Sequence, residues 1–363
     1  MKIAVDISPI SKKSNSAHKV RGVGMYINFL VENLPKIDRE NEYVFVEDGK
    51  FPADVDLVHY PYFDPFFRTL PLHSKQRFVV TVHDLTPLVF PSHFPSGMRG
   101  KINWQIQKKL LKNSSGIAAD SACSKKDVEK LVGISGEKVK VVYLAADEGF
   151  KRLAVAPRSL GPRGLGSSWG MEIKKKYNLP EEYLLYVGDS TWNKNLPRLI
   201  DAVRRTKVKL VMVGKVWENS EFGISNNPWN DDLRTVLKKI EGDSQFIKLG
   251  FVEDVDIVKI YNLATALIMP SIYEGFGLPV LEAMQSGTPV ISSLGGSLPE
   301  IGGDAVWYMQ DLDPENIRLA IEKIMGDGAL RADLSTRGME QAKKFTAKKS
   351  IEELVRVYKS VNI

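Results

Sequence analysis

Residues 270–292 read Pro-Ser-Ile-Tyr-Glu-Gly-Phe-Gly-Leu-Pro-Val-Leu-Glu-Ala-Met-Gln-Ser-Gly-Thr-Pro-Val-Ile-Ser. The apolar run that ends at Pro270 predicts a buried strand, and Gly275 and Gly277 predict a loop whose backbone can approach a ligand closely. A helix is expected to begin near Leu278, because the proline that follows suits the first turn of a helix. The last residues of the stretch predict a further strand. This order of strand, loop, helix and strand is typical of a parallel α/β sheet.

Short apolar runs alternate with amphipathic stretches along the whole chain. Several runs are apolar throughout, which is typical of strands that helices cover on both faces. Two such series in tandem predict an α/β protein with two Rossmann-like, doubly wound domains. The expected strands are 2–7, 43–47, 56–60, 77–83, 116–120 and 139–144, and then 183–188, 208–213, 246–250, 266–270, 288–292 and 305–309.

A segment rich in glycine and proline, residues 151–180, separates the two series. We therefore expect an N-terminal domain over 1–170 and a C-terminal domain over 171–345. The chain ends in helical patterns, and Thr346 is a typical residue at the start of the last one, over 346–363.

The composition excludes several classes of protein. The 363 residues, 43% hydrophobic and 26% charged, are typical of a soluble globular protein. A single cysteine, Cys123, excludes a disulfide scaffold and a four-cysteine zinc site. No apolar run reaches the length of a membrane-spanning helix, and the first residues lack the apolar core of a signal peptide, so we expect a cytoplasmic protein. The net charge of +6 suits an anionic ligand, a nucleic acid or an anionic membrane surface.

Two acids flank the expected helix start after Pro270. Free N–H groups at a helix start attract anions, above all phosphate. Glu274 precedes the glycines and can face a ligand above that helix start, whereas Glu282 lies one turn into the helix and can reach another part of the same ligand. A carboxylate accepts hydrogen bonds from two hydroxyls, so a sugar and a ribose are natural partners. Alternatively, the two acids only complement the helix dipole.

This segment resembles the Glu-x7-Glu signature of glycosyltransferase family 4, and the resemblance extends over nearly the whole chain. It implies a retaining enzyme of the GT-B fold, in which two Rossmann-like domains face each other across a cleft. The first domain would bind the acceptor, the second a nucleotide sugar, and the final helix would cross back to the first. It also implies that Glu274 binds sugar hydroxyls and Glu282 the ribose. The backbone amides around the donor sugar and diphosphate would be those of Gly275, Phe276, Gly277 and Leu278.

A second motif is Tyr-Val-Gly-Asp-Ser-Thr-Trp-Asn-Lys-Asn-Leu at 186–196. A strand, a glycine turn, a cation and a helix in this order favour phosphate binding, so Lys194 is expected to neutralise the departing diphosphate. The alternative is a solvated lysine near a helix start. The family often has Arg-Lys here, but this chain has Asn193 before Lys194, and Arg198 or Lys215 is expected to compensate.

A third motif, Arg-Gly-Val-Gly at 21–24, follows the first strand. It resembles the family's glycine-rich loop near the donor phosphate, which would place Gly22 and Gly24 in that loop. A nicotinamide-dependent dehydrogenase is the rival interpretation, but it requires a third glycine where this chain has Ile27.

A fourth motif, Val-Thr-Val-His-Asp at 80–84, lies at the end of a strand, where doubly wound sheets place ligand-binding residues. By resemblance, His83 lies beside the donor sugar and bonds a hydroxyl or a main-chain group; Asp84 would orient it or cap the next segment. The bland alternative is a buried histidine with structural partners only. The turn at Phe251 and Val252 resembles the one that meets the nucleobase through main-chain groups.

Two Asp-x-Asp pairs, at 54–56 and 254–256, mimic the metal motif of the other large glycosyltransferase fold. The first runs into a strand and the second opens a helix, so we expect no bound metal and no cofactor. Protein groups can stabilise the charge of the leaving group instead.

The expected helix 97–113 carries five cations and no acid. At helical spacing Lys101, Lys108 and Lys112 share one face, with Trp104 and Leu111 beside it, while Ile102, Ile106 and Leu110 face elsewhere. Such a face suits weak contact with an anionic membrane, and a plain solvated face is the alternative.

Together these observations predict a metal-independent, retaining transferase. It would move a hexose from a nucleoside-diphosphate sugar to a hydroxyl of a glycan or lipid-linked acceptor. GDP-mannose is the first donor that we expect. The motifs resemble those of bacterial mannosyl- and rhamnosyl-transferases of surface-polysaccharide assembly. A nucleotide-sugar epimerase and a non-catalytic sugar-binding protein are the alternatives, and interrupted basic patches argue against a nucleic-acid partner.

Overall fold

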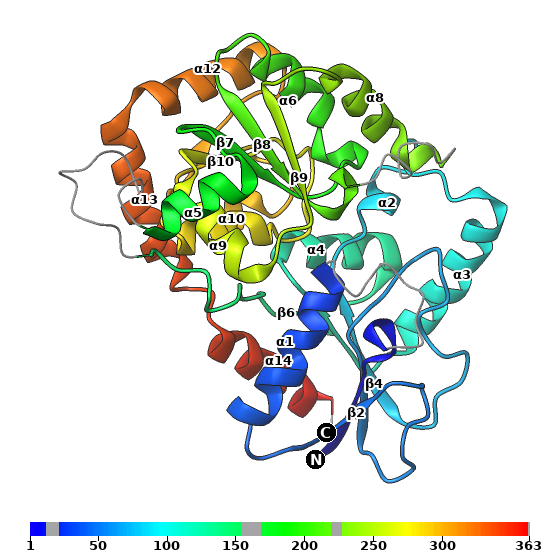
Figure 1. Ribbon diagram of the computed structural model, residues 1–363. Helices are drawn as coiled ribbons and strands as arrows, with labels where there is room; N and C mark the ends of the chain where they lie inside the picture. Colours follow the sequence, from blue (N-terminus) through cyan, green and yellow to red (C-terminus); the bar gives the residue numbers. More distant parts are fainter. Residues whose placement is uncertain (12–21, 154–167, 219–226, 362–363) are drawn as a thin grey trace. The chain divides into compact units, whose positions relative to one another are not determined.

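The computed structural model describes residues 1–11, 22–153, 168–218 and 227–361 (Figure 1). The chain divides into two compact units, Met1–Ala145 with Phe345–Ile363, and Ala146–Lys344. The boundary follows Ala145 rather than residue 170, because the residues after it pack within the second unit. The Phe150 ring lies 5.6 Å from that of Tyr261, and the Leu153 amide donates to Asn262 Oδ1 at 2.8 Å.

The first unit is built on a six-stranded sheet in which all neighbouring strands are parallel. The strand order is β2-β1-β3-β4-β5-β6, so the direction of winding reverses between β1 and β3. The strands are β1 (Lys2–Asp6), β2 (Glu42–Val46), β3 (Leu57–Tyr60), β4 (Arg77–Val82), β5 (Gly116–Ala119) and β6 (Val139–Val141). All six lie where the sequence predicted strands.

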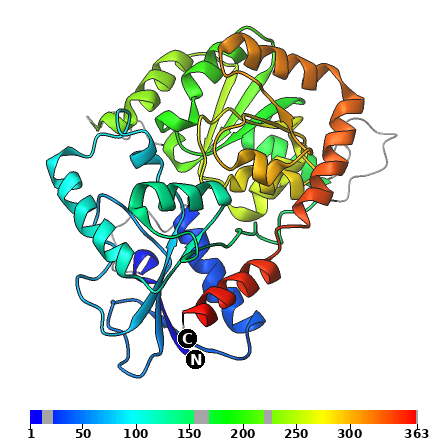
Figure 2. The ribbon, with the colours of Figure 1, turned by 180° about the vertical axis from the view of Figure 1, so that it is seen from behind.

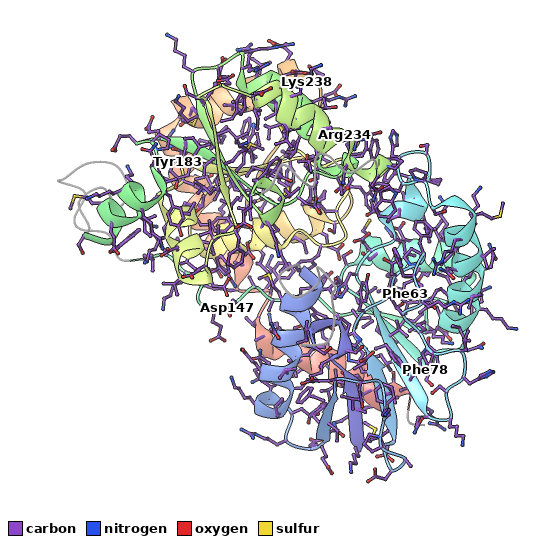
Figure 3. The ribbon with its side chains drawn as sticks, turned by 45° about the vertical axis from the view of Figure 1, so that its right-hand side comes forward. Phe63, Phe78, Asp147, Tyr183, Arg234 and Lys238 are labelled. Carbon is purple, nitrogen blue, oxygen red and sulfur yellow. The ribbon has the colours of Figure 1, made fainter. Side chains whose placement is uncertain are left out.

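Helices cover both faces of this sheet. They are α1 (Gly22–Ile37), α2 (Thr86–Val89), α3 (Gly97–Asn113), α4 (Ala122–Asp127) and the C-terminal α14 (Ala347–Ser360). The helices α1 and α14 pack side by side, red beside blue in Figures 1 and 2. The Thr346 hydroxyl caps α14 by accepting from the Lys349 amide, as expected for a helix that begins there. The other face carries a core with Leu110 of α3 and Phe78 of β4, the latter labelled in Figure 3.

The apolar residues of α3 do not all lie on its buried face. Leu111, expected beside the basic face, is fully buried, and Ile102, expected on another face, is 55% exposed. The reason is that the inner face includes buried polar residues, Asn103 and Gln107, which bind the neighbouring loop. A pattern of apolar residues alone therefore misplaces the buried side of this helix.

The second unit has its own six-stranded parallel sheet, in the order β12-β11-β10-β7-β8-β9. Numbered within the unit, this is the 3-2-1-4-5-6 order of the dinucleotide-binding Rossmann sheet, and it reverses between β7 and β10. The strands are β7 (Tyr183–Val187), β8 (Lys209–Val213), β9 (Phe246–Gly250), β10 (Ala266–Met269), β11 (Val290–Ser292) and β12 (Trp307–Tyr308). These six also match the predicted runs.

The helices of the second unit form two layers, with α6, α8 and α12 packed in one and α5, α9 and α10 in the other (Figure 1). Their bounds are α5 (Ser168–Tyr177), α6 (Leu196–Val203), α8 (Asp231–Ile240), α9 (Asp254–Leu263), α10 (Leu278–Gln285), α11 (Leu298–Gly302), α12 (Pro314–Gly326) and α13 (Gly328–Ala342). Across the described parts of both units, no helix combines the length and the apolar character needed to cross a bilayer.

Candidate active site

The reversal point of the second sheet brings two of the predicted site residues together. In doubly wound sheets, ligands bind at the carboxyl ends of the strands where the strand order reverses. Here those strands are β7 and β10, and the loops that follow them carry Lys194 and Glu274 respectively. Lys194 Nζ lies 2.8 Å from both Oε1 and Oε2 of Glu274. The topology therefore joins two residues that are 80 positions apart in the sequence.

The Glu274 carboxylate is buried but has donors on both oxygens. The residue is 9% exposed, and besides Lys194 it accepts a hydrogen bond from Ser271 Oγ at 2.6 Å. A carboxylate at this depth needs such partners, because an unpaired buried charge is costly. The sequence predicted that Lys194 meets the diphosphate, whereas the structure shows it on Glu274. Its contact with a donor stays a prediction.

Glycines fix the loop that carries Glu274. Gly277, at the start of α10, has φ +101°, and a Cβ there would lie 2.8 Å from Leu298 Cδ2. Gly296 has φ +63°, and its Cβ would lie 2.3 Å from the Glu274 carbonyl oxygen. Neither site accommodates a side chain. The hydroxyl of Ser297 donates to the carbonyls of Glu274 and Phe276, at 3.1 and 2.7 Å.

The backbone expected around the donor diphosphate runs through this same loop. Phe276 is buried, while Gly275 and Leu278 are partly exposed, and α10 begins at Leu278 as predicted. Exposed backbone next to a helix start is suited to an anion. The contacts of these residues with a donor stay a prediction.

Asn193 joins the two loops. Its side-chain amide donates to the Tyr273 carbonyl at 2.9 Å, its side-chain oxygen accepts from Thr191 Oγ1 at 2.8 Å, and its own carbonyl accepts from the Ile272 amide at 2.6 Å. An arginine at this buried position could not make the same short contacts. The two proposed substitutes, Arg198 in α6 and Lys215 after β8, are both exposed.

Glu282 has a different environment from Glu274. It is 6% exposed in α10, and its Oε2 accepts a hydrogen bond from the Tyr261 hydroxyl of α9 at 2.7 Å. Burial raises the pKa of Glu282 to about 7; the Tyr261 hydrogen bond opposes this increase, while the charges of Asp254 and Asp147 add to it. Asp147 is labelled in Figure 3. The carboxyl group therefore titrates near neutral pH.

In the turn after β9, one main-chain N–H group already donates a hydrogen bond to a carboxylate of the protein. The Phe251 amide donates to Glu218 Oε1 at 3.1 Å, and the Phe251 ring is 47% exposed, whereas Val252 is buried. Gly250 allows this contact, since a Cβ there would lie 2.4 Å from Glu218 Cγ. A nucleobase at this turn, which stays a prediction, would meet a carboxylate that sequence reasoning missed.

His83 of the first unit has protein acceptors at both ring nitrogens. Nδ1 lies 2.7 Å from Asp120 Oδ2, and Nε2 lies 3.1 Å from the Pro61 carbonyl. Burial lowers the pKa of His83, but the charge and hydrogen bond of Asp120 and the Pro61 carbonyl outweigh it, so the net shift is upward. A ring between two acceptors is satisfied when it is doubly protonated.

Asp120, not Asp84, orients the histidine. Asp84 instead accepts from the Thr86 amide at 2.8 Å and so caps the next segment, which was the second of its two expected roles. Asp120 follows β5, which pairs with β4 in register Val82↔Ala119. The rule that found His83, an ionisable residue after a strand, would also have found Asp120. The role of His83 toward a donor stays a prediction.

Gly22 and Gly24 lie in the first turn of α1, not in a loop. In the described part of α1, Tyr26, Ile27 and Leu30 supply the buried face. Arg21 of the same motif lies outside the described residues.

A buried chain of hydrogen bonds crosses the first unit, and sequence reasoning missed it. The Tyr358 hydroxyl of α14 lies 2.8 Å from His59 Nδ1, His59 Nε2 lies 2.8 Å from Thr81 Oγ1, and Thr81 lies 3.1 Å from the Tyr26 hydroxyl. The Tyr26 ring in turn meets His83 edge-on at 4.9 Å. Burial lowers the pKa of His59 to about 3, so this histidine is neutral.

Among the residues that the structure describes, no group of three or more His, Cys, Asp or Glu side chains could hold a metal ion. One acid of each Asp-x-Asp pair has a lysine partner instead. Asp54 lies 2.7 Å from Lys2, and Asp256 lies 2.6 Å from Lys176.

Comparison with known families identifies the chain. The family model described as Glycosyltransferase Family 4 matches residues 22–149, and the one described as Glycosyl transferases group 1 matches residues 171–341. The chain is a family 4 glycosyltransferase. The predicted family and the enzyme class are thereby confirmed.

Two curated relatives of this glycosyltransferase are named as mannosyltransferases. O-antigen chain mannosyltransferase B of Escherichia coli is 29% identical over 309 residues, which cover 84% of this chain and 75% of that relative. The serotype-specific mannosyltransferase WbdA of Escherichia coli is 27% identical over 292 residues, or 78% of this chain and 34% of WbdA. This chain therefore spans about a third of WbdA's length.

Solved structures show the fold of the glycosyltransferase. Sucrose-phosphate synthase from Thermosynechococcus elongatus matches with a TM-score of 0.73 at 16% identity, over 99% of this chain and 98% of that one. Anabaena HepE in complex with UDP and glucose matches with a TM-score of 0.73 at 16% identity, over 99% and 100%. The fold is GT-B, with two Rossmann-like domains, as predicted.

Proposed function

We propose that this glycosyltransferase moves mannose from GDP-mannose to a hydroxyl of a growing surface polysaccharide or its lipid-linked precursor, with retention at the anomeric carbon. The mannosyltransferases among its relatives support the sugar, and the names of those relatives give no support to an epimerase. The observation that carries the proposal is the Lys194–Glu274 pair at the reversal point of the second sheet.

The pair suits a transfer in which the leaving group carries away negative charge. The bond between the anomeric carbon and the diphosphate oxygen breaks, the bond to the acceptor oxygen forms on the same face, and the acceptor proton passes to the leaving phosphate. Lys194 can stabilise the diphosphate only if it shares or leaves Glu274. A sugar hydroxyl that donates to Glu274 would compensate for that loss. Donor binding would therefore replace the ion pair with two ligand contacts.

A panel of nucleotide sugars tests the donor. A ligand that binds only the folded chain raises its melting temperature in proportion to the logarithm of its concentration over Kd. We expect GDP-mannose to give the largest shift, with UDP-glucose and GDP alone as comparisons. A larger shift with a UDP sugar would contradict the GDP donor. Mass spectrometry of a lipid-linked glycan after incubation would then show whether one hexose is added.

The proposed reaction needs no divalent metal. We expect turnover to persist in excess EDTA, because Lys194 and the backbone at the start of α10 supply positive charge at the leaving group. A complete loss of turnover on chelation, restored by manganese or magnesium, would contradict a metal-free mechanism.

A further inference from the structure

The outward face of α3 carries large apolar side chains. The inner face contains Gly100, Asn103, Gln107, Leu110 and Leu111, all buried. On the opposite side, Met98 is 81% exposed and Ile102 is 55% exposed. The outer side of a surface helix is normally polar, so two exposed apolar residues one turn apart call for a partner.

Cations surround these two residues. Arg99, Lys101, Lys109 and Lys112 of α3 are all exposed, and the helix has no acidic residue. Within the described parts of the chain, none of these four forms an ion pair. The face is thus both apolar and strongly positive.

Lys108 and Trp104, which the sequence placed on this basic face, are engaged by the protein itself. Lys108 Nζ donates to the Leu131 carbonyl at 2.7 Å and lies 5.6 Å from the centre of the Trp104 ring. The outward face is therefore defined by Met98, Ile102 and the four exposed cations, and Lys108 provides a control on the same helix.

The helix is held firmly by a neighbouring loop. Asn103 Nδ2 donates to the Phe66 carbonyl at 2.9 Å, and Gln107 Nε2 donates to Thr69 Oγ1 at 2.7 Å. In the same loop the Phe67 ring is 66% exposed. The buried amides keep the inner side of α3 against the protein, so the apolar residues stay on the outside.

We propose that the outward face of α3 docks this glycosyltransferase on an anionic lipid bilayer. Basic side chains are attracted to the surface potential of anionic lipids, and exposed apolar residues enter the headgroup region. A second copy fits less well, because a symmetric contact would bring Lys101, Lys109 and Lys112 against their own equivalents. The inference rests on the proposed function only in giving access to a lipid-linked acceptor.

Co-sedimentation with vesicles tests the docking without donor, acceptor or turnover, so it is independent of the proposed reaction. Wild type is expected to pellet with phosphatidylglycerol-containing vesicles at low salt, to be released as salt rises, and to stay in solution with phosphatidylcholine alone. Lys101, Lys109 and Lys112 changed together to glutamine should weaken binding about fivefold per cation, or about a hundredfold in all. Met98→Ser with Ile102→Ser should weaken the binding that remains at higher salt.

Two controls test whether vesicle binding depends on this face of α3 or only on the net charge of the protein. The first control, Lys108→Gln, should bind vesicles like wild type. The second changes Lys348, Arg356 and Lys359 of α14 to glutamine, which removes the same charge from exposed positions elsewhere and should weaken binding less. Melting temperatures would show that each variant is folded. Failure of wild type to pellet, or an equal loss in the α14 control, would overturn the proposal. Dimers that disappear in the Met98 and Ile102 variant, without vesicle binding by wild type, would assign the face to self-association instead.

Discussion

Glu274 and Glu282 belong to one motif and are buried almost equally, yet their surroundings differ. Glu274 faces a cation, Lys194, and the hydroxyl of Ser271. Glu282 faces the neutral phenol of Tyr261, and burial together with the charges of nearby carboxylates raises its pKa to about 7. The two acids therefore differ in their partners: Glu274 has a cation within hydrogen-bond distance, whereas Glu282 has a phenol there and like charges nearby.

Because their partners differ, the two acids are suited to different roles in the reaction. Glu274 already has donors on both oxygens, so a ligand must displace or share them. Among the residues that the structure describes, Glu282 has a single hydrogen-bond donor, Tyr261, and it binds ribose hydroxyls best once it has lost its proton. We expect Glu274 to act on the reacting sugar and Glu282 to control donor affinity and its dependence on pH.

The largest effect should come from Glu274→Gln. The amide keeps the size of the side chain but removes the charge that pairs with Lys194, so we expect turnover to fall roughly 100-fold to 1000-fold. Binding of the free nucleoside diphosphate should be retained, since that ligand lacks the sugar. Steady-state kinetics would measure turnover, and calorimetry would measure binding of the nucleoside diphosphate. Normal turnover in this variant would contradict the proposed role.

Lys194→Ala tests the cation side of the pair. Of the described partners it leaves Glu274 the Ser271 hydroxyl, and we expect a loss of about 1–3 kcal/mol in the free energy of unfolding, reduced by the partial exposure of the lysine. Adding Glu274→Gln should recover part of that loss, which urea denaturation of both variants would reveal. Diphosphate affinity should fall more than nucleoside affinity; equal losses would place Lys194 outside the phosphate site.

Glu282→Gln should make stability less dependent on pH. Because the folded-state pKa is raised from 4.5 to about 7, the folded chain holds a proton that the unfolded chain releases, and stability falls as pH rises through that window. The variant should match wild type near pH 4.5 and exceed it at pH 8 by up to about 3 kcal/mol. Denaturation at several pH values would measure this.

Glu181→Gln, at an exposed acid of the same unit, is the control for Glu282→Gln.

Wild-type donor affinity should rise with pH across the same window, because ribose hydroxyls donate to the ionised carboxylate. A flat affinity profile would remove Glu282 from the ribose site.

Tyr358→Phe gives a neutral reference with the smallest effect. It removes one uncharged hydrogen bond to His59, which lies with Tyr358 in the first unit, and we expect a loss of roughly 1 kcal/mol in stability. Donor affinity should stay unchanged. If this variant destabilises the chain as much as Lys194→Ala, the charge of the Lys194–Glu274 pair adds nothing beyond a hydrogen bond.

Local patterns in the sequence predicted the strands, the start of α10 and the cap at Thr346, because apolar runs and capping residues act over a few positions. They did not predict that Lys194 meets Glu274, since that contact depends on the strand order of the sheet. The buried face of α3 depends on the fold for a related reason. Asn103 and Gln107 are buried only because a distant loop supplies their partners.

The division of the chain has a consequence for its folding. The second unit, Ala146–Lys344, is continuous, whereas the first is complete only with α14, which follows the second unit in the sequence. That helix supplies Ile351, Leu354 and Tyr358, all buried. We therefore expect a chain that ends at Lys344 to fold its second unit while the first stays incomplete. Such a truncated chain should resist protease over the second unit alone, and protection of the first unit would contradict this expectation.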